Sequence, residues 1–225
     1  MDELVLFDID RTLLQGHEHP ETFSFAFKAV YEVNAEKDWE TTQGMTDQQI
    51  IKKTLMEKGL NEEQIMSKMT QCIEEMVNYF RKTINKFSRR TAEGVGELLR
   101  ELNNRNILLG LVTGNLEGIA RAKLEQVGIN QYFKVGGFGS DDTNRTNLVK
   151  LAIKRAERGF GFKFNNNVFL IGDSPRDIEA GKEAGVKTIG VTTGVYSEEQ
   201  LEEAGADFVI KNFKDKNKIL GIIFK

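Results

Sequence analysis

The sequence predicts an α/β fold: a doubly wound, Rossmann-like parallel sheet core with an inserted all-α helical cap domain. Short apolar runs rich in branched residues alternate with segments of helical periodicity, a pattern typical of a parallel sheet covered by helices on both faces. One long interval departs from this alternation, because it offers helical stretches and no convincing strand. We therefore expect residues 1–13 and 91–225 to form the core and residues 14–90 to form the cap.

The elements of the core follow from these patterns. Helices are expected around Leu98, where apolar residues recur every three or four positions, and around Ile119, where a similar stripe ends before Gly128. The final segment KILGIIFK is compatible with a packed helix, a strand or a contact surface. The strands are expected at residues 4–7, 107–112, 168–171, 188–191 and 208–210.

The cap is expected to contain three helical stretches. Thr46 and Gln49 have the spacing of a capping box at the start of one of them. In the longest stretch, the single cysteine lies within an apolar stripe, which predicts a buried structural thiol. That stripe is expected to comprise Ile65, Met69, Cys72, Ile73, Met76 and Phe80.

Composition favours small partners. The chain has 225 residues, 40% of them hydrophobic, which suffices for one core or for a core with a small satellite domain. Its net charge of −3, with both signs interspersed, predicts binding to neither nucleic acid nor an anionic membrane. No run approaches the roughly 18 apolar residues of a membrane span, and Asp2 and Glu3 differ from the basic start of a signal peptide. We expect a cytoplasmic protein, either a monomer or a homodimer.

Two carboxylates follow the first strand. The segment FDIDRTLL places Asp8 and Asp10 two residues apart, so strand periodicity directs both side chains the same way. Active sites of open α/β sheets lie beyond the carboxyl ends of the strands, where such a pair suits a nucleophile and an acid/base partner. An Asp-rich turn leaving a strand explains the pair equally well when it is taken alone.

A candidate phosphate site follows the strand that ends in LLGLVT. Thr113 supplies a hydroxyl there, and Gly114 and Asn115 precede a helix whose first N–H groups can bind phosphate. Asn115 also fits the role of helix N-cap, and the two roles are compatible. A phosphate site also needs a fixed cation, which we expect to be Arg145, at the start of a later helix. The alternatives in the same segment are Lys150, Lys154 and Arg155.

A third carboxylate, Asp173, follows the strand VFLI in the segment GDSPRD. Pro175 fits the first position of a new helix. Ser174 and Asp177 have the spacing of a capping box, so Asp177 is either a cap or a support for a metal site. Carboxylates that converge without His or Cys select a hard cation, and Mg²⁺ prefers few protein oxygens plus waters and substrate phosphate. We therefore expect Mg²⁺ rather than zinc.

Taken together, these segments resemble the haloacid dehalogenase superfamily. Its four motifs occur here in order as DIDRT, LVTGN, a basic residue and GDSPRD. The resemblance implies a doubly wound sheet with a movable all-helical cap inserted after the first motif. It also implies phosphoryl transfer, because Asp10 stands where the dehalogenases usually lack a second acid.

Carried over by position, the resemblance gives each residue a role. Asp8 looks like the nucleophile and a Mg²⁺ ligand, and Asp10 looks like the acid/base that also offers its backbone carbonyl to the metal. Thr113 and Arg145 look like phosphate-binding residues, and Asp173 looks like the remaining metal ligand. The implied activity is Mg²⁺-dependent hydrolysis of a small phosphorylated metabolite, a phosphomonoester, through an aspartyl-phosphate intermediate.

Within the superfamily, the segments VTGN, FGSDD and GADFVIKNF resemble phosphatases related to phosphoglycolate phosphatase. Arg145 departs from that branch, whose third motif usually carries Lys-Pro. Arg11 stands where most members have Gly, at a cost on the order of 1 kcal/mol if φ is positive there. The alternatives are a phosphomutase of the same superfamily acting on a sugar phosphate, and a non-catalytic protein that binds a phosphate ligand.

The cap sets the choice of substrate in this reading. We expect His17 and His19 to lie in a solvated turn near the cap junction rather than to bind a metal. The candidate cap residues near the pocket are Phe23, Phe27, Tyr31 and Gly44.

Overall fold

The computed structural model describes residues 3–16, 21–38, 40–165 and 167–224, and the strands within them form one large and one small sheet. The large sheet comprises β1 (Leu4–Phe7), β4 (Leu108–Thr113), β5 (Val135–Phe138), β6 (Val168–Gly172), β7 (Lys187–Val191) and β8 (Phe208–Ile210). Its order is β5-β4-β1-β6-β7-β8, and every neighbouring pair is parallel. Strand β1, which carries the first motif, therefore lies in the interior of the sheet.

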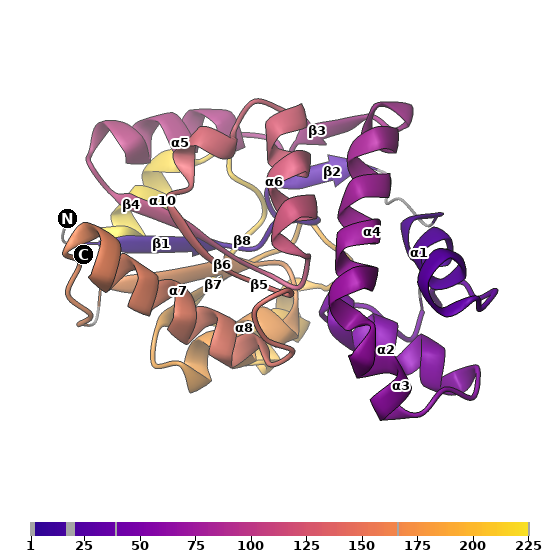
Figure 1. Cartoon of the computed structure of the whole chain (residues 1–225). Coiled ribbons are helices and arrows are strands. Elements are labelled where there is room, and N and C mark those ends of the chain that lie inside the picture. Colours follow the sequence, from indigo (N-terminus) through magenta and orange to yellow (C-terminus); the bar gives the residue numbers. More distant parts are fainter. Residues whose placement is uncertain (1–2, 17–20, 39, 166, 225) are drawn as a thin grey trace.

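Helices cover both faces of this sheet (Figure 1). Val5 and Phe7 of β1 pack toward one face and Leu4 and Leu6 toward the other, as the alternation of side chains along a strand requires. The first face carries α5 (Val95–Asn104), α6 (Glu117–Gln126) and α10 (Lys216–Ile223). The second face carries α7 (Arg145–Phe160) and α8 (Pro175–Glu183), with α9 (Glu198–Glu203) beside α8. The predicted α/β class and doubly wound sheet are confirmed.

The cap is a helical layer that stands against α6 (Figure 1). It contains α1 (Glu21–Tyr31), α2 (Asp47–Glu57), α3 (Glu62–Ser67) and α4 (Met69–Thr83), followed by the short 3₁₀ helix η1 (Ile84–Lys86). Its apolar cluster includes Phe27, Ile51 and Met76, together with Leu116 and Ile119 from the start of α6. Because Ala120 and Leu124 of α6 belong to the core cluster, this helix is shared by the two parts.

The two crossings between core and cap pair with each other. Strand β2 (Leu14–Gly16) runs antiparallel to β3 (Arg89–Thr91), and the two form the small sheet. The expectation that residues 14–90 contain no strand was therefore wrong at both ends. Each strand has only three residues, too few for periodicity to reveal.

Two further differences concern single elements. Strand β5 was missed because its sequence, VGGF, has two glycines, which are depleted in strands. A Cβ on Gly137 would lie 2.1 Å from the carbonyl oxygen of Leu148, so the close approach of α7 requires glycine there. The longest cap helix is interrupted at Lys68, which ends α3 and precedes α4.

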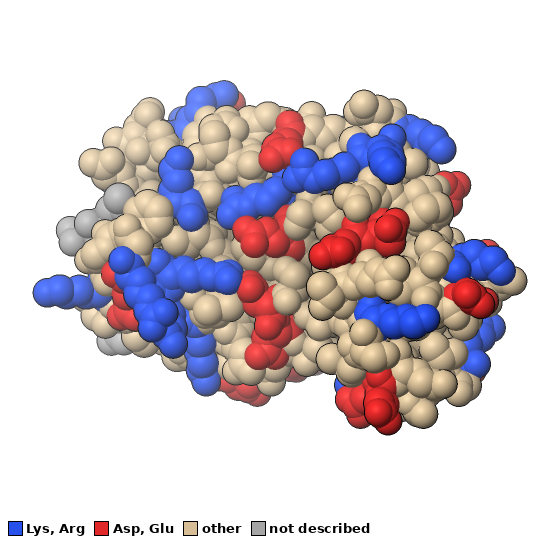
Figure 2. Space-filling view, in the orientation of Figure 1, with Lys and Arg blue, Asp and Glu red and all other residues tan. Residues whose placement is uncertain are grey.

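Other expectations are confirmed. The five predicted strands are present, and Thr46 and Gln49 form a reciprocal capping box. The C-terminal segment, for which the sequence left a helix, a strand and a contact surface open, contains α10. Cys72 is fully buried, whereas His17 and His19 lie outside the described residues. Among the described helices, none has the length and apolar character needed to cross a membrane. On the face shown in Figure 2, acidic and basic side chains are interspersed over both core and cap.

Candidate active site

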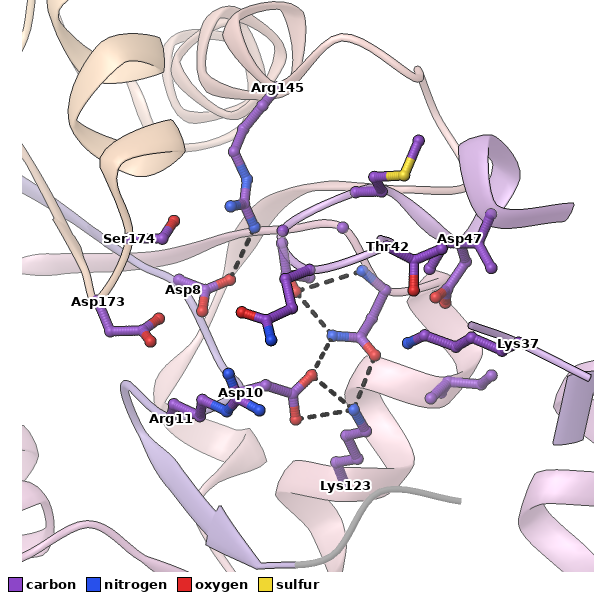
Figure 3. Close-up of a pocket in the computed structure, with 18 of the residues that line it drawn as sticks. Asp8, Asp10, Arg11, Lys37, Thr42, Asp47, Lys123, Arg145, Asp173 and Ser174 are labelled. Atoms are coloured by element: carbon purple, nitrogen blue, oxygen red, sulfur yellow. Dashed lines mark hydrogen bonds and ion pairs between the residues drawn. The ribbon is translucent and has the colours of Figure 1, made fainter. Parts of the chain in front are cut away.

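Three strand ends meet at one edge of the large sheet. Since β4 and β6 flank β1, Thr113, Asp8 and Asp173 lie close together at the carboxyl ends of these strands. A cavity of about 170 Å³ lies between this edge and the cap, and Figure 3 shows the acids facing it. The predicted residues that line it are Asp8, Asp10, Thr113, Gly114, Asn115, Arg145 and Asp173.

Arg145 lies between two acids. It is the first residue of α7, as predicted, and its Nη2 atom is 3.0 Å from Asp8 Oδ1. Its Nη1 atom is 2.9 Å from Asp177 Oδ1. The other cations of this helix lie elsewhere: Lys150 and Lys154 are exposed, and Arg155 pairs with Asp141.

Asp8, Asp173 and Asp177 form a buried cluster in which one oxygen of each lies within 4.8 Å of the others. Burial, followed by the charge of Asp177, raises the pKa of Asp8 well above its ordinary value. The same two causes raise the pKa of Asp173 to about 7. Three buried carboxylates beside one guanidinium favour an added cation, and their all-oxygen donor set fits Mg²⁺. The cluster contains Asp8 and Asp173 of the predicted ligand set and adds Asp177. The contribution expected from Asp10 is its backbone carbonyl, not its carboxylate.

Asp177 is a helix cap, one of the two roles that the sequence left open. Its Oδ2 accepts hydrogen bonds from the backbone N–H of Ser174 at 3.2 Å and from the Ser174 hydroxyl at 2.6 Å. Its other oxygen faces Arg145 in the acid cluster. The residue thus holds the start of α8 while contributing charge beside Asp8.

Asp10 is held by a clamp of two side chains from the β4–α6 region. Lys123 Nζ lies 2.8 and 2.6 Å from the two Asp10 oxygens, and Asn115 Nδ2 donates to Asp10 Oδ2 at 2.7 Å. Lys123 also donates to Asn115 Oδ1 at 2.8 Å, which closes a triangle. Burial alone would raise the pKa of Asp10, but the charge and hydrogen bonds of Lys123, with smaller contributions from Asn115 and Arg89, outweigh burial and lower that pKa. Asp10 and Asp8 are thus shifted in opposite directions.

Lys123 is a residue that the sequence reasoning missed. Its side chain is only 7% exposed, an unusual environment for lysine. The sequence contained a signal that could have identified this residue. Lys123 follows Ile119 by four positions and Leu116 by seven, which places it on the apolar face of α6. A buried lysine on an apolar stripe requires an acidic partner, and Asp10 is that partner.

The turn before α6 differs from the prediction. Asn115 is not the N-cap; that position belongs to Leu116, and the Asn115 side chain binds Asp10, Lys123 and the Thr113 hydroxyl instead. Two N–H groups at the start of the helix, which was expected to bind phosphate there, already have partners. Leu116 N–H donates to Asp47 and Glu117 N–H donates to Ser140.

Gly114 has a steric reason to be glycine. A Cβ there would lie 2.8 Å from the backbone oxygen of Met45 and 3.1 Å from Thr46 Cα. Both residues belong to the cap, so at Gly114 the backbone of the cap closely approaches the backbone of the turn between β4 and α6.

Arg11 has a φ of 63°, in the left-handed region where a side chain costs about 1 kcal/mol. Its backbone is fixed on both sides. The N–H donates to the carbonyl of Leu14 at 2.8 Å, and the carbonyl accepts hydrogen bonds from the side chains of Gln15 and Thr193. The side chain lines the cavity beside Asp10 (Figure 3).

The cap supplies the wall opposite the acids. Phe23 and Gly44 line the cavity as expected, whereas Phe27 and Tyr31 are buried in the apolar cluster of the cap. The same wall carries polar groups that were not predicted, including Thr22, Lys37, Thr42, Gln43 and Asp47. The Thr22 hydroxyl is buried without a hydrogen-bond partner among the described residues.

Sequence comparison assigns this architecture to a known family. The model of the haloacid dehalogenase-like hydrolase family matches residues 5–191, which include all four motifs and the cap. PpaX of Clostridium perfringens is 28% identical over 215 residues, 93% of this chain and 93% of that protein. The phosphoglycolate phosphatase of Escherichia coli K12 is 30% identical over 156 residues, 66% of this chain and 61% of that protein.

Solved structures show the same fold. CbbY from Rhodobacter sphaeroides, crystallised in complex with phosphate, superposes with a TM-score of 0.74 at 19% identity. The match covers 96% of both chains, so sheet and cap together are shared.

Proposed function

Because the chain belongs to the haloacid dehalogenase-like hydrolase family, we propose that it is a Mg²⁺-dependent phosphatase that hydrolyses a small phosphomonoester through an aspartyl-phosphate intermediate. The main support for the proposal is that two aspartates after the same strand, β1, have different surroundings and pKa values shifted in opposite directions. Asp8 lies beside Arg145 in a buried acid cluster, and Asp10 lies apart from that cluster in contact with Lys123. Two carboxylates in distinct environments can serve as nucleophile and as acid/base.

Asp8 is the nucleophile in this proposal. It attacks the phosphoryl group in line, the bond to the leaving oxygen breaks, and the phosphoryl group remains on Asp8. Attack requires the ionised carboxylate, which burial disfavours and the guanidinium of Arg145, 3.0 Å away, favours. Arg145 is also placed to stabilise charge on the phosphoryl oxygens once they approach Asp8.

Asp10 is the general acid and general base in this proposal. In the free site Lys123 keeps it ionised, and an incoming phosphate dianion competes for the same ammonium and so favours protonation of Asp10. Protonated Asp10 then gives its proton to the leaving alkoxide and becomes a base. It next removes a proton from the water that hydrolyses the aspartyl phosphate, which releases phosphate and regenerates Asp8.

The metal would be held by the acid cluster. Asp8 and Asp173 are its proposed side-chain ligands, with Asp177 beside them and the backbone carbonyl of Asp10 as a further ligand implied by the family. When bound, Mg²⁺ supplies positive charge that offsets both the buried carboxylates and the phosphoryl oxygens.

The cavity favours a polar leaving group. Polar atoms line its cap side, where the Thr22 hydroxyl is buried and Lys37 lies 5.2 Å from the centre of the Phe23 ring. A hydroxylated or charged leaving group can bind these atoms, whereas an apolar group would leave the buried Thr22 hydroxyl without a partner.

Replacing the nucleophile tests the proposal. Asp8→Asn should lower kcat for an aryl phosphate by more than about a thousandfold at saturating Mg²⁺, because an amide cannot form the covalent intermediate. Glu202→Gln makes the same carboxylate-to-amide change on an exposed residue and serves as the control. Trapping phosphate from a labelled substrate on the wild-type chain, and not on Asp8→Asn, would identify the intermediate. Substantial turnover by Asp8→Asn would refute the assignment.

A further inference from the structure

Helix α6 begins without a cap of its own. Its N-cap position is Leu116, whose apolar side chain accepts no hydrogen bond, although the first N–H groups of a helix need acceptors. Leu116 is also fully buried, so water does not supply an acceptor readily. The acceptor therefore comes from elsewhere in the fold.

Asp47 of the cap supplies it. Its Oδ2 accepts the Leu116 N–H at 2.9 Å, across 69 positions of sequence. In the reverse direction, the backbone N–H of Asp47 donates to the carbonyl of Gly114 at 2.8 Å. Asp47 is the first residue of α2, so the start of a cap helix and the start of a core helix are joined by two reciprocal hydrogen bonds. The carboxylate also lies where the dipole of α6 favours negative charge.

The segment that Asp47 holds carries the clamp on Asp10. Asn115 immediately precedes Leu116, and Lys123 lies two turns along α6. Both side chains contact the Asp10 carboxylate, at 2.7 Å from Asn115 and at 2.6 Å from Lys123. A shift of the start of α6 would therefore displace both members of the clamp together.

We propose that Asp47 is a positioning residue: by capping α6 from the cap domain, it couples docking of the cap to the placement of Asn115 and Lys123 on Asp10. The inference rests on the proposed function, in which Asp10 is the acid/base. Asp47 acts through these residues and takes no part in bond making. The acid/base is thus fully positioned only when the cap is docked.

The environment of Asp47 supports the coupling. Its side chain is buried where cap and core meet, and burial raises its pKa to about 6. The charges acting on it are Lys37 and Lys123, which lower that pKa, and Asp10, which raises it. When the cap is docked, the buried Asp47 carboxylate accepts a hydrogen bond from the buried N–H of Leu116, so neither group lacks a partner. Lifting the cap would return both groups to water, so this hydrogen bond requires the docked arrangement.

Two variants that each remove one hydrogen bond between cap and core test the inference. Asp47→Ala removes the cap of α6, whereas Gln48→Ala removes the 2.7 Å hydrogen bond from Gln48 Nε2 to the carbonyl of Gly139, which does not involve α6. Asp47→Asn retains an acceptor oxygen and serves as the rescue. The first measurement is amide hydrogen exchange of the full-length variants with Mg²⁺ present.

We expect exchange at Leu116 and in the first turn of α6 to be about tenfold faster in Asp47→Ala, and close to wild type in Gln48→Ala and Asp47→Asn. The second measurement is turnover of an alkyl and an aryl phosphate. For Asp47→Ala, kcat should fall at least tenfold for the alkyl phosphate, less for the aryl phosphate, and with KM changed little. A purely structural role would lower both activities equally through the fraction of folded protein.

Unchanged exchange at Leu116 in Asp47→Ala, or equal losses of kcat for both substrates, would overturn the inference. If Asp47→Ala does not fold, Asp47→Glu replaces it, since the added methylene displaces the carboxylate while keeping its charge. Faster exchange and a leaving-group-dependent loss are again the supporting result, and wild-type values for both refute it. A wild-type chain that hydrolyses no phosphomonoester would refute the proposed function, while the exchange measurements would still decide whether Asp47 holds α6.

Discussion

Replacing Lys123 by methionine removes the cation from Asp10 while keeping a side chain of similar length. The ammonium lies 2.6 Å from Asp10 Oδ2, which corresponds to roughly 6 kcal/mol of attraction at an effective dielectric constant of about 20. Much of this attraction is offset by desolvation of the lysine, whose side chain is 7% exposed. Breaking a fully buried pair costs about 3–5 kcal/mol. Because the Asp10 side chain is 35% exposed, we discount this to about 2–3 kcal/mol.

The free energy of unfolding of Lys123→Met should therefore be about 2–3 kcal/mol lower than that of the wild type at pH 7, which lowers Tm by roughly 5–10 °C. The ordinary pKa of Asp10 is 3.8 and its folded-state pKa is lower. The stabilisation by the ion pair is thus present above about pH 4 and is lost as the pH falls through the lowered pKa. The gap between variant and wild type should shrink accordingly below pH 4.

Urea unfolding at pH 7, 5, 4 and 3 measures this gap. A double-mutant cycle with Asp10→Asn isolates the pairwise free energy from the loss of lysine packing. A coupling free energy near zero at pH 7, or a gap that stays constant down to pH 3, would refute the reasoning.

Three further predictions concern the same cavity. Asp10→Asn should lower kcat more for alkyl phosphates, whose leaving groups need a proton, than for aryl phosphates with good leaving groups; equal losses in a steady-state assay would limit Asp10 to holding the metal. Arg11→Gly should be more stable than Arg11→Ala by about 1 kcal/mol in urea unfolding, because both lose the side chain but only glycine is relaxed at a φ of 63°; equal stabilities would contradict the strain. Mg²⁺ at ten times its Kd should raise the free energy of unfolding of the wild type by about 1.4 kcal/mol, and Asp173→Asn should lose most of this gain; an unchanged Tm on addition or chelation of Mg²⁺ would count against the acid cluster as the metal site.

The sequence predicted well what depends on local pattern. The apolar runs of β1, β4, β6, β7 and β8 marked their strands, and the parallel order then brought Asp8 and Asp173 together at adjacent strand ends. Strand β5 was not predicted, because the close approach of α7 requires glycine at position 137 and glycine has a low strand propensity. Local pattern therefore located the sheet and its acids before any contact was known.

What the sequence did not reveal depends on contacts between distant residues. Lys123 meets Asp10 across 113 positions, and Asp47 meets Leu116 across 69. Neither pair has a local signature that names its partner. The N–H groups at the start of α6 were predicted to be available for phosphate because the sequence shows no local acceptor for them. Their acceptors, Asp47 and Ser140, are distant in the sequence and are brought close only by the fold.

The reciprocal hydrogen bonds between α2 and α6 set a rule for exchanging the cap. A chimera that receives a foreign insertion between β2 and β3 would keep every motif of the core, yet α6 would lose its cap unless the graft brought an acceptor to the place of Asp47. Position 47 is therefore one of the places, with the backbone contact at Gly114, where a grafted cap must match the core. Under the proposed function, a graft with an acceptor at this place would keep Asn115 and Lys123 on Asp10, while the cap residues that line the cavity could vary.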